Sequence, residues 1–528
     1  MKRVSLFGIL LIAFLLRVLY LDKFPVGFHA DEASNGYDAY SILKTGRDQW
    51  GNFMPLVLKS FGDYKSPLYA YLTIPSVAIF GLNKFAVRLP NVILGTAAVL
   101  ALWLLVGEIL KKKNIALVAA FLLAVSPWHI MMSRGAFEAN LITFFLPLGV
   151  YLYLTKRETL ASIVLGLNLF SYHSSKLITP IVFLGLLFLT KRKKLFPMIV
   201  FSAFFLLMLY TFKLGGGTRV LERSIFRGAL EEGAKVKIEL IQKGMNPILA
   251  RILHNKYQVT VKRFLANYNQ YFSAKFLFVD GAAEATYGMI PGVGVIYIFE
   301  GILLLGNIFL IFSKKWRFLV LMLMFWLLIS PLPAALATGV VYYGNRGEGM
   351  IPVFQILEAL GLLGFSLCIR KMNKKFVAVI AGAFLIFSIL EIGNFIKIYF
   401  GEPLKISQQG MLYGNLETAS WLSKEFNGAS VIVSRSFSEP QIFVAFANKW
   451  DSGDFQKETK NWKLETWVDQ IPSYGLGNYT FKSIDWKTDS IKKGTFLVGK
   501  PADFPKNLVP DKIFYYSGGE EAMYAKIN

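Results

Sequence analysis

The sequence is poor in the residues that cross-link a chain or bind metals. Its 528 residues include one cysteine, Cys368, so no disulfide can form within the chain. The four histidines, at positions 29, 129, 173 and 254, are scattered and show no metal-ligand spacing. We therefore predict no bound cofactor and no metal site, although a divalent-metal requirement stays open. The sequence also lacks internal repeats, glycine–serine linkers and low-complexity tracts.

Charged residues are scarce as well, at 17% of the chain, whereas a soluble protein carries about 25%. Hydrophobic residues make up 54% and aromatic residues 15%. Apolar runs of about 15–23 residues recur through residues 1–400, and helices of that length cross a hydrocarbon core of roughly 30 Å. Because charges lie only at the ends of these runs, a large soluble core is excluded. The pattern predicts a polytopic α-helical membrane protein with about 11 transmembrane helices.

The net charge of +23 comes from basic clusters between the apolar runs. It does not indicate a nucleic-acid partner, because no basic helix or aromatic–basic repeat is present. The six clusters are residues 2–3, 111–113, 156–157, 191–194, 314–317 and 370–375. Positive residues mark cytoplasmic segments, so we predict an integral plasma-membrane protein with a cytoplasmic N-terminus. No small-residue cleavage site follows the first run, which is therefore predicted to remain as an anchor.

This topology assigns each apolar run to a side of the membrane. The predicted spans are about 4–21, 91–110, 115–130, 139–155, 160–172, 177–190, 197–212, 292–312, 317–333, 350–369 and 376–398. Residues 68–81 are apolar but short, and a crossing there would invert every later basic cluster. We therefore predict that residues 22–90 stay external, with 68–81 forming an amphipathic helix in the membrane interface.

Eleven crossings divide the chain into a transmembrane part, residues 1–398, and a small external α/β domain, residues 399–528. The latter holds 15 basic and 15 acidic residues, with a strand predicted at 430–433 and a helix at 417–425. The external loop 213–290 differs, with 12 basic and 6 acidic residues. A surplus of that size suits anionic lipid headgroups or phosphates.

Candidate chemistry begins with the adjacent carboxylates Asp31 and Glu32, which follow the first membrane exit and open a predicted helix. A helix N-terminus favours an ionised carboxylate, and an ionised aspartate can accept the proton of an attacking hydroxyl. The alternative is a plain N-cap, because acidic residues are common at helix starts.

A second group follows the third predicted span, where Trp128, Arg134 and Glu138 lie near the outer membrane edge. Glu138 could place a second carboxylate across a cavity from the first, and the alternative is a salt-bridged turn. Charges near membrane depth are costly, which favours a functional role.

Three external segments offer cations near the headgroup level: Arg134, then His173 with Lys176, and finally Arg346. One such cation could be an interfacial anchor, whereas several that converge would bind a phosphate without a metal. A lone histidine is more often a hydrogen-bonded structural residue.

Several of these residues occur in the order of a known family. The motifs are Asp31-Glu32, Gly62-Asp63-Tyr64-Lys65-Ser66-Pro67-Leu68, Phe80-Gly81, Arg88-Leu89-Pro90, Ser133-Arg134…Glu138 and Tyr172-His173-Ser174-Ser175-Lys176. Over about residues 1–400 the chain resembles the GT-C glycosyltransferases, and within them the protein O-mannosyltransferase and lipid A aminoarabinose-transferase group.

The resemblance implies an inverting enzyme that moves a sugar from a polyprenyl phosphate to an acceptor on the external side. It implies that Asp31 is the base or acceptor-binding group, that Glu138 is a second acidic position, that Lys176 holds the lipid phosphate, and that Arg346 lies in a late external loop where relatives place basic residues. Beside these we predict a catalytic role for Glu32, donor-phosphate binding by Arg134 and His173, and an acceptor or sugar pocket with Tyr37, Lys65 and Trp128. Many relatives have Asp where this chain has Glu138. The His-Pro-Pro-Leu pattern of mannosyltransferases is here Lys65-Ser66-Pro67-Leu68, so the acceptor could be a glycan, a lipid or a protein.

Two other functions stand as alternatives. A transporter or flippase of lipid-linked sugars predicts inverted repeats and ionisable residues within the spans, whereas we expect the ionisable residues only on the external side. A non-catalytic scaffold that displays residues 399–528 gives no reason for carboxylates and cations to gather in separate external loops.

Overall fold

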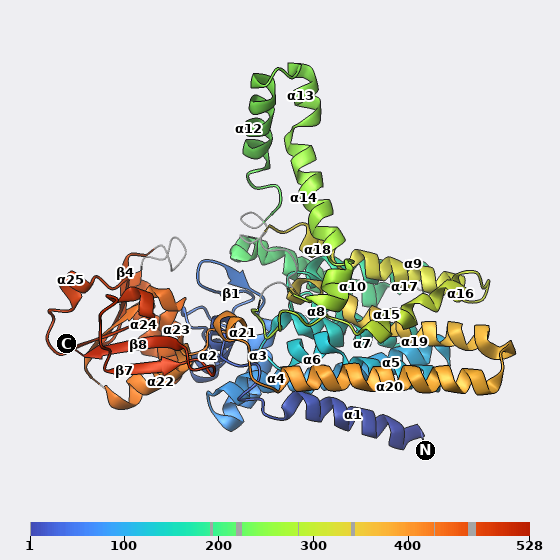
Figure 1. Ribbon diagram of the computed structural model, residues 1–528, viewed down its shortest axis with the longest axis horizontal. Coiled ribbons are helices and arrows are strands. Elements are labelled where there is room, and N and C mark those ends of the chain that lie inside the picture. Colours follow the sequence, from blue (N-terminus) through green and yellow to red (C-terminus); the bar gives the residue numbers. More distant parts are fainter. Residues whose placement is uncertain are drawn as a thin grey trace.

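The computed structural model describes residues 2–190, 194–217, 224–282, 285–338, 344–426, 428–462 and 471–527. Most of the basic cluster at 191–194 lies outside these residues. Figure 1 shows a bundle of helices that run side by side, a smaller domain built on a sheet at one end, and a helical hairpin that projects sideways.

The bundle helices coincide with the predicted apolar runs. They are α1 (Lys2–Val18), α4 (Lys84–Leu110), α5 (Lys113–Val125), α6 (Pro127–Ser133), α7 (Ile142–Leu154), α8 (Glu158–Asn168), α9 (Ser175–Thr190), α10 (Leu195–Tyr210), α15 (Ile298–Leu305), α16 (Asn307–Ile311), α17 (Arg317–Ile329), α18 (Leu332–Ala335), α19 (Ile351–Cys368) and α20 (Lys374–Tyr399). Short helical turns η1 (Glu138–Leu141), η2 (Phe212–Gly216), η3 (Lys275–Val279), η4 (Gly344–Met350) and η5 (Ile369–Lys371) join some of them.

Within the described residues, four helical stretches are long and apolar enough to cross a membrane: Lys84–Leu110, Arg317–Ala335, Gly344–Cys368 and Lys374–Tyr399. The pair α5–α6 bends by 57° and makes a fifth if it is one broken span. The bend lies at Pro127, which cannot donate a backbone hydrogen bond. Several further apolar helices have 10–17 residues. The chain is thus an integral membrane protein, while the number of eleven spans and the orientation stay predictions.

The expectation that ionisable residues lie only on the external side is wrong. Glu300 of α15 and Glu358 of α19 are fully buried inside the bundle, and so is Glu348 of η4. Glu300 and Glu358 are each a single acidic residue within an apolar run, whereas Glu348 follows Arg346 in a segment predicted to be external. Helix packing can turn such a side chain away from lipid, and the sequence does not show which helix face points inward.

The first segment predicted to be external folds into α2 (Ala30–Thr45), the paired strands β1 (Leu58–Lys59) and β2 (Tyr64–Lys65), and α3 (Leu68–Phe80). α3 contacts both α2 and α4. Its Tyr69 hydroxyl donates to the carbonyl oxygen of Val87 (2.9 Å) and its Ser76 hydroxyl to that of Ala86 (2.6 Å). The interfacial position of this helix stays a prediction.

Residues after α20 fold around a six-stranded sheet. In spatial order its strands are β4 (Ser473–Leu476), β5 (Tyr479–Lys482), β3 (Ser430–Ser434), β6 (Thr495–Gly499), β8 (Glu521–Ile527) and β7 (Lys512–Tyr515). β3 is parallel to β5 and β6, and the other pairs are antiparallel. The accompanying helices are α21 (Lys405–Gly410), α22 (Asn415–Glu425), α23 (Pro440–Asn448), α24 (Ser452–Thr459) and α25 (Trp486–Asp489). The predicted strand and helix are confirmed as β3 and α22.

α2 connects this sheet domain to the bundle, because it contacts α3 and α4 on one side and α23 and α24 on the other. The rings of Phe28 and Phe446 lie 4.9 Å apart. At Gly36 an added Cβ would come within 2.4 Å of Val87 and 2.9 Å of Phe446, so only glycine allows this close packing. The start of α2 is therefore held in a fixed place beneath the sheet domain.

Candidate active site

Asp31 lies in the first turn of α2 and is partly open to solvent. His29 is the N-cap, and its Nδ1 accepts a hydrogen bond from the Asp31 backbone N–H (3.2 Å). The Asp31 side chain is 34% exposed. Its Oδ2 accepts a hydrogen bond from the Tyr287 hydroxyl (3.2 Å) and lies 3.6 Å from His29 Nδ1. This carboxylate is positioned by two neighbours while one side stays accessible.

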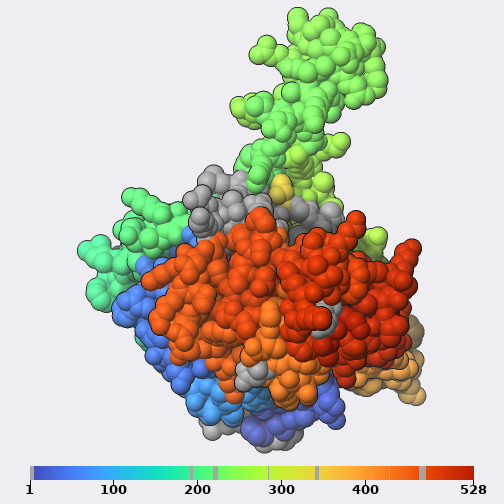
Figure 2. Space-filling view, turned by 90° about the vertical axis from the view of Figure 1, so that its left-hand side faces the viewer, coloured from blue at the N-terminus to red at the C-terminus, as the bar shows by residue number. Residues whose placement is uncertain are grey.

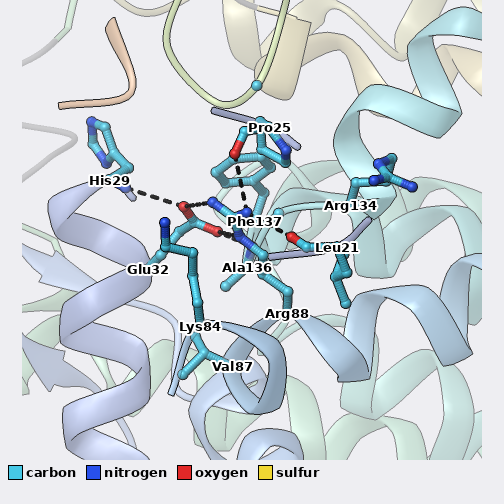
Figure 3. Close-up of polar contacts among 12 residues, drawn as sticks. Leu21, Pro25, His29, Glu32, Lys84, Val87, Arg88, Arg134, Ala136 and Phe137 are labelled. Atoms are coloured by element: carbon cyan, nitrogen blue, oxygen red, sulfur yellow. Dashed lines mark hydrogen bonds and ion pairs between the residues drawn. The ribbon is translucent and has the colours of Figure 1, made fainter. Parts of the chain in front are cut away.

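Glu32, the next residue, is fully buried in a bidentate ion pair (Figure 3). Arg88 Nε lies 2.9 Å from Oε1, and Arg88 Nη2 lies 3.0 Å from Oε2. The backbone N–H groups of Ala136 (2.9 Å) and His29 (3.1 Å) also donate to this carboxylate. Arg88 donates in turn to the carbonyl oxygens of Leu21, Pro25 and Gly27.

This environment decides the charge of Glu32. Burial raises the pKa of Glu32, but Arg88 and the hydrogen bonds from Ala136 and His29 lower it by more than burial raises it. The pKa therefore lies below the ordinary value. The carboxylate therefore stays ionised and fully engaged. The predicted catalytic role finds no accessible oxygen here, and the geometry makes Glu32 a positioning residue that holds Asp31 in place.

The segment before Glu138 is held by the same cluster. Asn91 Nδ2 donates to the carbonyl oxygens of Gly135 (2.6 Å) and Phe137 (2.9 Å). Between them, the Ala136 backbone N–H donates to Glu32. Glu138 then begins η1 with a partly exposed side chain. The Phe137 ring meets the edge of the Tyr287 ring, with centroids 5.4 Å apart. Asp31 and Glu138 thus lie on either side of a Tyr287–Phe137 contact.

A cavity of about 250 Å³ brings together two of the predicted cations, His173 and Arg346. Its other lining residues are mainly apolar: Tyr172, Ser174, Leu177, Ser224, Phe226, Pro333, Ala334, Leu336 and Ala337. Arg346 Nη1 donates to the carbonyl oxygen of Thr338 (3.3 Å), while Leu177, Phe226 and Leu336 are exposed on the outer surface. We call this the donor cavity, after the donor-phosphate role predicted for His173 and Arg346; it combines an arginine and a histidine with an apolar wall that opens outward.

Lys176 and Glu138 lie near the donor cavity without lining it. Lys176 is on the first turn of α9, and its Nζ lies 5.7 Å from the Phe212 ring centroid. The turn η1, which Glu138 opens, contacts η4, which contains Arg346. Asp31 is not among the lining residues either. Of the four side chains predicted to gather around one pocket, Asp31, Glu138, Lys176 and Arg346, only Arg346 lines this cavity.

Two predicted site residues have structural contacts instead. Arg134 is buried, and its guanidinium donates to the carbonyl oxygens of Leu16 (2.7 Å), Leu19 (2.7 Å) and Phe24 (3.2 Å). It therefore closes the end of α1 rather than facing a phosphate. Tyr37 packs against Phe455 and donates to the carbonyl oxygen of Trp450 (3.1 Å), so it belongs to the contact between α2 and the sheet domain.

Lys65 and Trp128 are buried as well. Lys65 Nζ donates to the Ser34 hydroxyl (2.7 Å) and pairs with Asp38 (3.1 Å). Trp128 Nε1 donates to the carbonyl oxygen of Gly344 (3.2 Å) and its ring meets Phe276 edge-on. The polar atoms of both side chains bind partners inside the protein. The sequence shows that these residues are polar, but it does not show that their hydrogen-bond partners lie within the fold.

Tyr287, Asn91 and Arg88 hold the site together, and these roles were not predicted from the sequence. Tyr287 lies in a long loop with no motif around it, and its contact with Asp31 bridges residues far apart in the chain. Asn91 begins the predicted span 91–110, and Arg88 comes just before it. Because Arg88 is charged, it was assigned to the preceding loop. The buried partner Glu32 allows Arg88 to enter the helix, which starts at Lys84 instead of 91.

No group of three or more His, Cys, Asp or Glu side chains that could hold a metal occurs in the part of the chain that the structure describes. The candidate site offers two partly exposed carboxylates, Asp31 and Glu138, and a cavity that is lined by Arg346, His173 and apolar side chains.

Known proteins share this architecture. Residues 64–214 match the family described as dolichyl-phosphate-mannose-protein mannosyltransferase. ArnT from Cupriavidus metallidurans in the apo state is 12% identical, with a TM-score of 0.50 over 99% of this chain and 97% of that chain. The apo oligosaccharyltransferase from Archaeoglobus fulgidus is 15% identical, with a TM-score of 0.50 over 94% of this chain and 69% of that chain. No curated protein matches the sequence.

The chain has a GT-C fold. The resemblance noted in the sequence motifs is thereby confirmed. In this GT-C fold, the matched region 64–214 runs from β2 to η2 and includes Glu138, His173 and Lys176. Asp31 lies before the matched region and Arg346 after it, so their roles rest on the geometry described above.

Proposed function

We propose that this protein is an inverting glycosyltransferase that moves a sugar from a polyprenyl phosphate to an acceptor at the external membrane face. The observation that carries the proposal is the donor cavity. Its His173 and Arg346 can bind phosphate oxygens, because charge-assisted hydrogen bonds are the strong ones. Its exposed apolar residues Leu177, Phe226 and Leu336 suit an isoprenoid chain. The dolichyl-phosphate donor named in the matching family's description supports the same donor class.

The chemistry needs a base for the acceptor and positive charge for the leaving group. Asp31 takes the proton of the acceptor hydroxyl while the hydroxyl oxygen attacks the anomeric carbon. The bond from that carbon to the phosphate oxygen breaks, and the electron pair leaves on the polyprenyl phosphate. Arg346, His173 and Lys176 stabilise the growing phosphate charge, and loss of one such group costs about 3–4 kcal/mol. A phosphate leaving group needs little protonation, so one general base suffices.

Glu138 is proposed as the second group on the acceptor side. It lies next to the Tyr287–Phe137 contact and at the start of a turn that meets η4. From there it can orient an acceptor hydroxyl toward Asp31 or bind a sugar hydroxyl.

The acceptor has its own approach in this proposal. A cleft of about 750 Å³ separates the first external segment from the sheet domain, with Trp50, Lys59, Tyr64 and Lys460 among its lining residues. Its lining also includes Leu214 of η2, the turn whose Phe212 lies under Lys176. Aromatic rings and lysines, with no carboxylate among the described lining residues, suit a sugar-bearing or anionic acceptor.

A transporter of lipid-linked sugars is the second candidate, because Glu300, Glu348 and Glu358 are buried within the bundle. Such residues are costly in a membrane and often mark transport pathways. The two functions differ in what happens to the lipid-linked sugar: a transporter moves it intact, whereas the transferase cleaves its bond to the phosphate.

The test is purified protein in liposomes with a radiolabelled polyprenyl-phosphate sugar. The transferase releases polyprenyl phosphate and a labelled acceptor or free sugar, and the Asp31→Asn variant does neither. Labelled lipid that crosses the bilayer without bond cleavage would support the transporter instead. Ala266→Gln, at an exposed position of the projecting hairpin, is the control for handling and reconstitution.

A further inference from the structure

The hairpin of residues 229–270 has a surface that the proposed reaction does not use. It consists of α12 (Ala229–Gln242), α13 (Pro247–Leu253) at the tip and α14 (Lys256–Gln270). Figures 1 and 2 both show it standing clear of the rest of the chain. α12 packs against α14, so each helix has one covered face while its other faces stay open.

An apolar stripe follows the open side of α13 and α14. Leu249 and Leu253 lie four residues apart on α13, and Tyr257, Val261 and Leu265 are spaced in the same way on α14; this spacing keeps side chains on one face of each helix. All five are exposed, with fractions from 41% to 70%. A continuous exposed apolar stripe marks an interaction surface.

The stripe starts at the end of a membrane span. Tyr268, one turn past Leu265, donates its hydroxyl to the carbonyl oxygen of Leu328 near the end of α17 (2.7 Å). In Figure 1 the hairpin runs across the direction of the long bundle helices, at the end of the bundle that faces the sheet domain. A helix that runs perpendicular to the membrane spans at that level lies along the membrane interface.

The charge of the hairpin matches this surface. Residues 229–270 contain seven Lys or Arg and three Glu. Lys256 and Lys262 are exposed beside the stripe, and Lys262 borders the same surface hollow as Tyr257, Val261 and Leu265. Basic residues beside an apolar face are typical of helices that lie on anionic lipid.

We propose that the hairpin lies flat in the external leaflet, with the stripe at the acyl boundary and its basic residues on lipid phosphates. Helices of this kind reach about 5–10 Å below the headgroups. The basic surplus, the origin on a span and the direction along the interface all favour lipid over a protein partner or a second copy.

The base of the hairpin also contacts a segment that lines the donor cavity. Arg263 donates to the carbonyl oxygens of Ile225 (2.9 Å) and Arg227 (2.8 Å), on either side of the lining residue Phe226. The Ile225 backbone N–H donates to the carbonyl oxygen of Leu336, another lining residue (3.1 Å). Resting on the proposed function, this link means that the anchored hairpin holds the cavity at the level of the donor phosphate.

Depth measurements test the anchor directly. In a Cys368→Ser background, a bimane label is placed on the stripe through Val261→Cys, or off it through Ala266→Cys. Ala266 is also exposed but lies about 140° around the helix from Val261. The protein is reconstituted in liposomes that contain anionic lipid and lipid brominated near the headgroup. We expect bromine to quench the label at 261 several-fold more than at 266. Equal quenching at both sites, or efficient cross-linking of two chains through residue 261, would overturn the proposal.

Activity then tests the link to the cavity. Val261→Gln with Leu265→Gln should raise the donor-lipid KM and leave turnover at saturating donor unchanged. Ala266→Gln introduces the same side chain off the stripe and should change neither. An unchanged KM in the double variant would overturn that link. Because the quenching can be repeated in the Asp31→Asn variant, the anchor is judged even if the transferase proposal fails.

Discussion

Asp31 and Glu32 are neighbours in sequence, yet one is partly exposed and the other is buried in an ion pair, and two isosteric substitutions separate the roles we propose for them. Glu32→Gln keeps the shape of the side chain but leaves the buried Arg88 guanidinium without its countercharge. Removing one partner of a buried ion pair costs about 3–5 kcal/mol. Asp31→Asn removes a charge that is 34% exposed and contacts Tyr287 and His29, so little stability depends on it.

The two variants should therefore differ in stability and activity in opposite ways. We expect Glu32→Gln to lower the thermal unfolding temperature clearly, with residual turnover in the fraction that stays folded. Asp31→Asn should unfold like the wild type and lose about 10²–10⁴-fold in kcat, the usual contribution of a general base. The assay pairs thermal unfolding in detergent with release of polyprenyl phosphate in liposomes.

The pH dependence gives an independent check. The pKa of Glu32 lies below its ordinary value, so its stabilising contribution is present above the ordinary carboxyl pKa of about 4.3 and is lost as pH falls through the lower folded value. The stability gap between wild type and Glu32→Gln should be constant at neutral pH and shrink in strong acid. If Glu32→Gln unfolds like the wild type at neutral pH, or if Asp31→Asn keeps full turnover, the division of roles is refuted.

Three further substitutions test other parts of the same geometry. Arg346→Gln should raise the donor KM about tenfold or more, since a charged hydrogen bond contributes about 1.5–3 kcal/mol; an unchanged KM in initial-rate kinetics would remove it from the donor cavity. Lys176→Ala should weaken donor binding in the same assay, and an unaltered donor titration would contradict that role. Burial and nearby Asp38 raise the pKa of Asp48 to about 6, so native stability should fall as pH rises from about 4 to about 6, by at most about 3 kcal/mol. Asp48→Asn should flatten that part of the profile, and a dependence equal to wild type would exclude Asp48 as its source.

The sequence was a good guide to the helices because a lipid environment imposes long apolar runs with charges at their ends. The predicted helix boundaries were wrong where a tertiary contact allows a charged residue inside a helix. α4 starts at Lys84 because Glu32 neutralises Arg88, and that partner lies 56 positions away. Glu358 of α19 was overlooked for a related reason, since the inward direction of a helix face depends on its neighbours.

The candidate site was predictable only in part. Motif order located Asp31, Glu138, His173 and Lys176, but it could not separate groups that react from groups that hold the fold. Arg134 and Arg346 are both arginines near the outer membrane edge. One donates to three carbonyl oxygens at the end of α1, and the other lines the donor cavity.

Saturation of hydrogen bonding gives a physical criterion for that separation. A carboxylate with four donors, as at Glu32, cannot accept a further proton without breaking an existing contact, and its ion pair keeps it ionised. A partly exposed carboxylate such as Asp31 can gain and lose an acceptor hydroxyl with little rearrangement. Its position is nevertheless fixed, because Glu32 ties the same helical turn to Arg88 and to Ala136. The buried pair thus supplies the rigidity, and the adjacent residue keeps the freedom that a proton transfer needs.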